Sequence, residues 1–201
     1  MKLKILMILL LIPAFVYPQS AKDLLVKLQG KYKSVKSFMA DFSQSTKAET
    51  GKDEFTSSGR IYFKKKDKFK IEFKDQILVT DGATVWNYNR KQNKVIITGF
   101  DNGPSVLSLD KFILEYPNEC EASFAGEGDK IILLKPKDKD ADFREIRITP
   151  DESTILSKVE FTDANGNYFS FRFTNVKLNE NLSDKLFKYT VPKGTRTVDL
   201  R

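Results

Sequence analysis

The chain has 201 residues, with 34 Lys and Arg against 27 Asp and Glu, so its formal net charge is +7. It contains no histidine and a single cysteine. These counts exclude Ser-His-Asp and Cys-His catalysis, histidine-based zinc sites and an internal disulfide. The lysines are interleaved with acids, which indicates a solvated surface; attraction to an anionic membrane surface or an acidic partner is the alternative.

The amino-terminal end has the pattern of a secretory signal. Lys2 and Lys4 precede an apolar run over residues 5–16, which is too short to span a bilayer comfortably. We expect residues 1–20 to be a cleaved signal peptide and residues 21–201 to form a single exported domain, large enough to fold around its own core. A retained membrane anchor is the alternative. Export argues against binding of nucleic acid.

An amphipathic helix is predicted for residues 21–35. Its apolar side chains recur at helical spacing, with lysines and Asp23 on the other side. They are Leu24, Leu25, Leu28, Tyr32 and Val35.

The period then changes to two, which indicates strands with one face in water and one in an apolar interior. Phe38, Ala40 and Phe42 alternate with polar or flexible residues. Further on, Phe69, Ile71 and Phe73 alternate with charged residues. Turn signals such as Asp81-Gly82 divide the rest of the chain into about eleven short strands. This density predicts a large, strongly curved antiparallel sheet.

Residues 104–116 interrupt the strands and return to helical spacing, with Pro104 suited to a first turn. A curved sheet whose open side is covered by this helix and the first one is the simplest packing of these parts. Periodicity alone suggests Val106, Leu107 and Phe112 for the face that this second helix turns toward the sheet.

The residues offer little for catalysis, and we expect neither enzymatic activity nor a cofactor. Cys120 has no second thiol or imidazole with which to bind a metal, and its neighbours Glu119 and Glu121 should raise its pKa. We interpret it as an incidental residue at a sheet edge. Paired carboxylates for a glycosidase remain available, but most of them lie at turns or on lysine-bearing strand faces. No phosphate-binding loop of the Walker type occurs.

One block, GRIYFKKKDKFKIEFKDQILVTDGATVWNYN over residues 59–89, resembles the core of the LolA family of periplasmic lipoprotein carriers. The shared elements are a strand ending in a basic step, an F-x-I-x-F strand, a D-G turn and a V-W-x-Y-N segment. The similarity extends from the first helix and its FMADFSQ continuation to the late segment FKYTVPKG.

The resemblance implies a mainly β fold: an unclosed barrel of about eleven strands with a helical lid. It implies a non-enzymatic periplasmic chaperone that is monomeric. Such a chaperone takes acylated lipoproteins from an inner-membrane ABC-type releasing complex, shields their acyl chains and passes them to an outer-membrane acceptor. Because no cysteine follows the apolar run, the chain does not match the membrane-anchored acceptor of the same fold.

The resemblance also suggests a binding site. The predicted lipid-binding cavity is lined by Phe38, Phe42, Phe69, Ile71, Phe73, Val106, Leu107 and Phe112. Lys65 takes the place of an arginine that latches the lid in the family, and we expect it to be the latch; a solvated residue at a strand end is the alternative. Phe69 matches a phenylalanine near the cavity mouth, although an ordinary core residue is an equal interpretation.

Two other functions stay open. The chain is alternatively a general periplasmic lipid- or glycolipid-binding module or a sensor of mislocalised lipoproteins, since related folds look alike in sequence. An enzyme acting on cell-wall glycan is the third class, and its activity would vanish on removal of one of two carboxylates.

Overall fold

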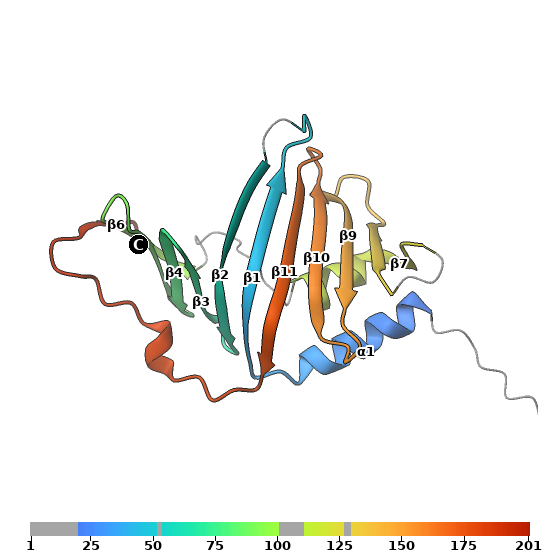
Figure 1. Ribbon diagram of the computed structural model, residues 1–201, viewed down its shortest axis with the longest axis horizontal. Coiled ribbons are helices and arrows are strands. Elements are labelled where there is room, and N and C mark those ends of the chain that lie inside the picture. Colours follow the sequence, from blue (N-terminus) through green and yellow to red (C-terminus); the bar gives the residue numbers. More distant parts are fainter. Residues whose placement is uncertain (1–19, 52–53, 101–110, 127–129) are drawn as a thin grey trace, which may run out of the picture.

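The computed structural model describes residues 20–51, 54–100, 111–126 and 130–201. They form a 12-stranded sheet with the order β12-β6-β5-β4-β3-β2-β1-β11-β10-β9-β8-β7 (Figure 1). Its strands are β1 (Ser37–Lys47), β2 (Glu54–Lys64), β3 (Lys68–Phe73), β4 (Gln76–Asp81), β5 (Thr84–Asn89), β6 (Lys94–Gly99), β7 (Cys120–Phe124), β8 (Ile132–Pro136), β9 (Phe143–Pro150), β10 (Leu156–Asp163), β11 (Tyr168–Leu178) and β12 (Arg196–Asp199).

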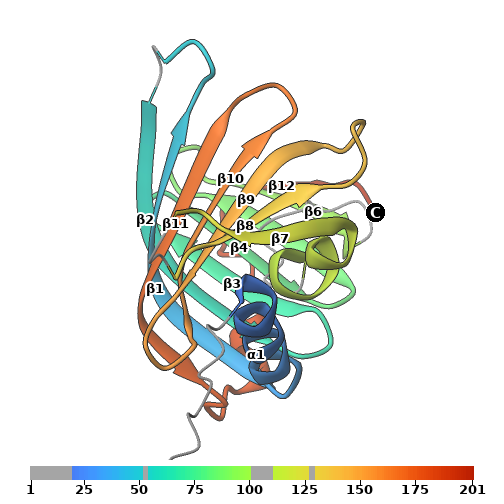
Figure 2. The same ribbon diagram turned by 90° about the vertical axis from the view of Figure 1, so that its right-hand side faces the viewer.

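The sheet is strongly curved and does not close, as the sequence predicts. Figure 2 shows it bending around the helices, which lie against its concave face. Its first and last strands in the order, β12 and β7, do not pair with each other. The count differs by one from the expected eleven, because β12 adds to the sheet by pairing in parallel with β6; the other pairings are antiparallel.

The first helix, α1 (Ala21–Lys33), is confirmed where the sequence predicts it and ends two residues earlier. It begins at a capping box: the Ser20 hydroxyl accepts from Asp23 N, and the Asp23 carboxylate accepts from Ser20 N, both at 3.1 Å. Lys31 and Lys33 in the last turn complement the negative end of the helix dipole. Its buried residues are Ala21, Leu24, Leu25, Leu28 and Tyr32.

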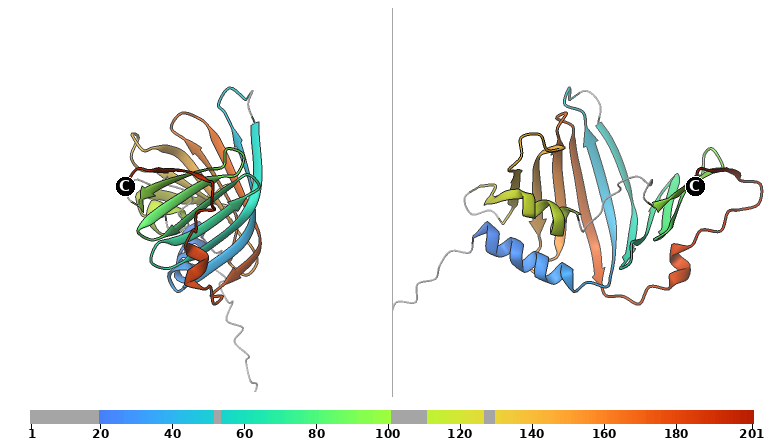
Figure 3. Two further views of the ribbon diagram at one scale, coloured as in Figure 1. Left: turned by 90° about the vertical axis from the view of Figure 1, so that its left-hand side faces the viewer. Right: turned by 180° about the vertical axis from the view of Figure 1, so that it is seen from behind.

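The second helical segment is described in part. Residues 104–110 of the predicted helix lie outside the described residues. After them, a π-helical turn, η2 (Lys111–Glu115), leads into a 3-10 turn, η3 (Tyr116–Glu119). Seen from behind, this segment lies beside α1 on the concave side of the sheet (Figure 3). No helix within the described part of the chain is long and apolar enough to cross a membrane.

The carboxyl-terminal segment returns along the sheet. After β11 it passes through a 3-10 turn, η4 (Asp184–Phe187), and ends beside β6 (Figure 1). Phe187 is fully buried, and the Tyr189 ring lies 5.6 Å from that of Tyr88 on β5. Leu78 faces the concave core, so its neighbour Ile77 and the residue paired with Ile77, Tyr88, lie on the outer face. The segment therefore covers the outer face of β3–β5, through η4 and Tyr189.

Candidate functional site

The concave face of the sheet carries a continuous apolar surface, and β1 supplies its centre. Phe38, Ala40 and Phe42 are at most 4% exposed. They alternate with less buried residues, so the predicted inward face of this strand is confirmed. The Phe38 ring meets that of Phe173 on β11 edge to face, with centroids 6.0 Å apart.

The strand β3 continues this face. Ile71 is 1% exposed and belongs to the same core cluster. Phe69 and Phe73 are partly buried and pack against it. Five of the predicted cavity residues therefore share one apolar surface: Phe38, Phe42, Phe69, Ile71 and Phe73.

The helical segment brings a sixth predicted residue to this surface. The ring of Phe112 in η2 lies 5.4 Å from that of Phe161 on β10 and 5.6 Å from that of Tyr116. Val106 and Leu107, the remaining two predicted cavity residues, lie outside the described residues.

Lys65, the predicted latch, contacts the end of α1. Its Nζ donates to the carbonyl oxygen of Lys33, the last residue of that helix, at 2.8 Å. Its backbone N–H donates to the Lys36 carbonyl at 3.0 Å. Both carbonyls lie at the α1–β1 junction, so the basic step of the β2–β3 hairpin is joined to the first helix. The Lys65 side chain itself is exposed.

Sequence reasoning missed the neighbouring Lys64. Its Nζ donates to the Leu182 carbonyl and to Asp184 Oδ1, both at 2.8 Å, and Lys68 approaches the same carboxylate at 3.3 Å. These lysines hold the pKa of Asp184 below its usual value. No local signal could have found this contact, because the partners are about 120 residues apart.

The aromatic residues of β10 and β11 were also missed. Phe161 and Phe169 stack with centroids 4.5 Å apart, and the ring of Phe171 lies 6.4 Å from that of Phe161. Phe171 and Phe173 are buried on the concave face. The period-two run Phe169, Phe171, Phe173 carries the same signal as Phe38 and Phe42 and could have identified these residues.

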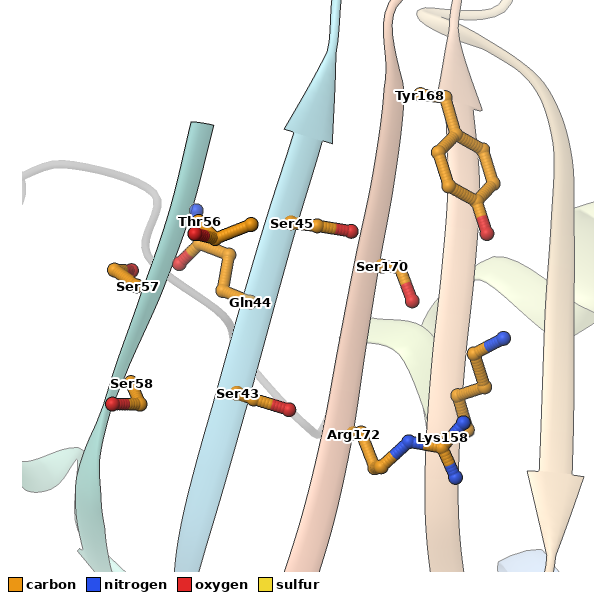
Figure 4. A pocket seen from close by; sticks show the side chains of 10 residues that line it. All are labelled: Ser43, Gln44, Ser45, Thr56, Ser57, Ser58, Lys158, Tyr168, Ser170 and Arg172. Atoms are coloured by element: carbon orange, nitrogen blue, oxygen red, sulfur yellow. The ribbon is translucent and has the colours of Figure 1, made fainter. Parts of the chain in front are cut away.

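The opposite face of the sheet carries a polar depression of about 600 Å³ (Figure 4). It is lined by Ser43, Gln44, Ser45, Thr56, Ser57, Ser58, Lys158, Tyr168, Ser170 and Arg172. Beside it, Glu160 accepts hydrogen bonds from Lys158 and Tyr168. Burial alone would raise the pKa of Glu160, but these two donors outweigh it and lower the pKa.

Cys120 begins β7, an edge strand of the sheet, as the sequence suggests. It is a buried free thiol, and burial raises its pKa, with a smaller contribution from the charge of Glu119. Within the residues that the structure describes, no group of three or more His, Cys, Asp or Glu side chains is arranged to hold a metal ion.

Comparisons with known proteins agree with this architecture. The model of the family "Outer membrane lipoprotein carrier protein LolA" matches residues 33–190. An outer-membrane lipoprotein carrier protein of Cupriavidus necator is 32% identical over 180 residues, covering 84% of each chain. One of Actinobacillus succinogenes is 27% identical, covering 96% of this chain and 93% of its own.

Among solved structures, an uncharacterized conserved protein of Thermus thermophilus superposes with a TM-score of 0.55 at 13% identity. The match covers 89% of this chain and 98% of that one, and it supports the fold. Since the family model covers well over half of the residues, the chain belongs to the LolA family of outer-membrane lipoprotein carriers, which are periplasmic and are not enzymes.

Proposed function

We propose that this carrier binds the acyl chains of lipoproteins released from the inner membrane and delivers them to an outer-membrane acceptor. The observation that carries the proposal is the continuous aromatic surface on the concave side of the sheet, which the helices cover. An acyl chain moved there from water gains about 0.8 kcal/mol per buried CH₂ group. Two or three chains therefore supply ample driving force for binding.

We assign the acyl contacts to the predicted cavity residues. Phe38, Phe42, Phe69, Ile71, Phe73 and Phe112 would contact the chains, with Val106 and Leu107 of the second helix beside them. In the described structure Phe38 and Ile71 are almost fully buried, so the chains take the place of contacts that these side chains now make within the protein. Cargo binding then requires the helices to move away from the sheet.

Lys65 is the latch in this proposal. Its bond to the Lys33 carbonyl joins the β2–β3 hairpin to the end of α1, which supports such a role. A hydrogen bond at an exposed site contributes on the order of 1 kcal/mol. The latch is thus weak enough to open at a membrane partner.

The remaining parts of the proposal concern processing and partners. The amino-terminal signal is removed on export by cleavage between Pro18 and Ala21, and the rest of the chain acts in the periplasm as a monomer. An inner-membrane ABC-type complex supplies the lipoprotein. The lipoprotein requires such a partner, because its acyl chains leave a bilayer slowly without one.

The test expresses the full chain, purifies the protein from the periplasmic fraction and determines its amino-terminal residue by mass spectrometry. The protein is then incubated with spheroplasts that hold labelled lipoproteins, with and without ATP depletion. We expect ATP-dependent appearance of a stoichiometric complex in the supernatant. The matched control is a cargo protein whose acylated cysteine is replaced by alanine, which should not form the complex.

Two results would contradict the proposal. Failure to release any lipoprotein, with free lipid still bound, would favour a general lipid-binding or lipoprotein-sensing module. Equal capture of the unacylated control would show that the acyl chains are not the recognised group.

A further inference from the structure

The strand β7 forms one edge of the sheet. Figure 1 shows it as the outermost strand on one side, and in the described sheet it pairs with β8 alone. Its sequence, CEASF, contains neither the lysine nor the proline that commonly protects an edge strand, and its register with β8 runs without a bulge. An edge of this kind is able to accept a further strand.

Two residues of β7 direct their backbone groups toward this edge. Beside the pair of Phe124 and Ile132, the Ala125 N–H donates to the Ile131 carbonyl at 3.0 Å. In an antiparallel ladder a bond at this place makes Phe124 a non-hydrogen-bonded position, and Ala122, two residues earlier, is another. The N–H and C=O groups of both residues therefore point away from β8, toward the position of an added strand.

A groove of about 480 Å³ lies between this edge and α1. Leu25 and Val26 line it from the helix, and Cys120 and Ala122 line it from the strand. Val26 is 57% exposed, although its side chain is apolar. Several peptide-binding domains hold an extended peptide as an added strand on a sheet edge, with alternate side chains in adjacent pockets. The edge of β7 and the groove beside it provide both parts of such a site.

The groove is positively charged. Lys22 of α1 and Lys137, which follows β8, both line it, and neither forms an ion pair with a described acidic residue. Glu121 is also in the lining, but it alternates with Ala122 of the core face. Its side chain therefore lies on the outer face of the sheet, opposite Lys135 in the register. These charges favour an acidic occupant.

We propose that the groove between α1 and β7 is a docking site for an extended, acidic segment of a partner protein, which adds to β7 as a further strand. Main-chain hydrogen bonds to Ala122 and Phe124 hold the segment, and an apolar side chain packs on Val26. Carboxylates of the segment meet Lys22 and Lys137. The groove shares no residue with the predicted acyl cavity, so the proposal goes beyond the proposed function and does not depend on it.

A synthetic peptide of the sequence TETVTET tests the site with the protein purified from the periplasm. In an extended peptide the two glutamates and the valine share one face, so they enter the groove together. With that face in the groove, the valine N–H bonds to β7 and the threonine N–H groups point away from it. The matched peptides carry one N-methyl group, either on the valine or on the threonine that follows it. Fluorescence anisotropy gives each dissociation constant.

Methylation of the valine should weaken binding by more than about tenfold, because it removes a main-chain hydrogen bond and places a methyl group against the edge. Methylation of the threonine should have little effect. K22E should weaken binding by roughly fivefold, as the loss of a surface ion pair does. K27E makes the same charge change on α1 outside the groove and should bind like the parent. Bound peptide should also slow hydrogen exchange of the Ala122 and Phe124 amides.

Three results would overturn the proposal. The first is equal binding of the two methylated peptides, or no binding of TETVTET at about 1 mM. The second is equal weakening by K22E and K27E. The third is a dimer that protects the Ala122 and Phe124 amides without any peptide, because the edge would then serve a second copy of the chain.

Discussion

The rings of Phe42 and Phe73 meet edge to face, with centroids 5.3 Å apart, although their strands are separated by β2. The residue between them in the register is Gly59. A Cβ atom there would lie 3.1 Å from Cε1 of Phe42 and would collide with the Glu72 carbonyl oxygen. Glycine thus lets two rings of the candidate lipid site meet over the backbone of the intervening strand.

We predict that G59A destabilises the protein by about 1–3 kcal/mol, because the added methyl group overpacks the core and displaces the Glu72 carbonyl. G30A is the matched control. Gly30 lies in α1 with nothing within 4 Å of the added Cβ, so alanine should stabilise the helix by up to about 1 kcal/mol. Urea denaturation of both proteins gives the two free energies. A G59A protein as stable as the parent would contradict the packing described above.

A second prediction concerns the hydrogen bond between Leu156 N and the Tyr32 hydroxyl, which is 3.0 Å long and buried. Y32F leaves this N–H without a partner, and the unfolding free energy should fall by about 1–3 kcal/mol. Y88F is the comparison, since the Tyr88 hydroxyl bonds an exposed Asn93 side chain and its loss should change stability by less than about 0.5 kcal/mol. Equal losses in the two proteins would argue against a structural role for Tyr32.

Local sequence patterns predicted the features that belong to a single strand or helix. The alternation of Phe38, Ala40 and Phe42 gave the inner face of β1 correctly because a single face of that strand is buried. The helical spacing of the leucines likewise predicted α1. The aromatic cluster to which several strands contribute was predicted only in part, because Phe169, Phe171 and Phe173 of β11 were not among the predicted site residues.

What remained unpredictable depends on contacts between distant segments. All of Ile77 to Thr80 is buried, which fits the continuous apolar run of β4. The sequence does not say what covers the second face; it is the carboxyl-terminal segment, about a hundred residues later. The parallel pairing of β12 with β6 was unpredictable for the same reason. A strand of four residues carries no local signal for the strand with which it pairs.

The third prediction tests that covering segment. Phe187 is fully buried in η4, close to β3 and β4. F187A should cost about 3–5 kcal/mol, the usual range for a buried phenylalanine, and should make the segment after β11 susceptible to protease. L200A, at an exposed position in the same segment, should stay within about 0.5 kcal/mol of the parent. A loss in F187A no larger than in L200A would show that the segment does not depend on this anchor.

The fourth prediction tests the latch. K65A removes the donor to the Lys33 carbonyl, so amides in the last turn of α1 should exchange hydrogen faster and bound lipopeptide should leave faster. K65R keeps a donor and should behave like the parent. K33A removes a neighbouring lysine but retains the accepting carbonyl, and it should also resemble the parent. If bound lipopeptide speeds amide hydrogen exchange in the last turn of α1 equally in K65A and in the parent, Lys65 is not a latch.

The last prediction concerns alkaline pH. Burial raises the pKa of Tyr32 to about 12, and the charge of Asp151 adds to this shift, while the hydrogen bond from Leu156 N opposes it. The unfolded phenol ionises near its ordinary pKa of 10.0. A folded-state pKa above the unfolded value means that the stabilising contribution is complete below about pH 10 and is lost as the pH rises through about 12.

The contribution of Tyr32 to the unfolding free energy should fall by roughly 2–3 kcal/mol as the pH rises from about 10 to about 12. To isolate the Tyr32 hydroxyl, the quantity to measure is the difference in unfolding free energy between the parent and Y32F, by urea denaturation at several values from about pH 9 to about pH 12. The advantage of the parent over Y32F should shrink as the pH rises, because phenylalanine has no proton to lose. A constant difference across the range would show that the Tyr32 hydroxyl ionises as readily in the folded protein as in the unfolded chain.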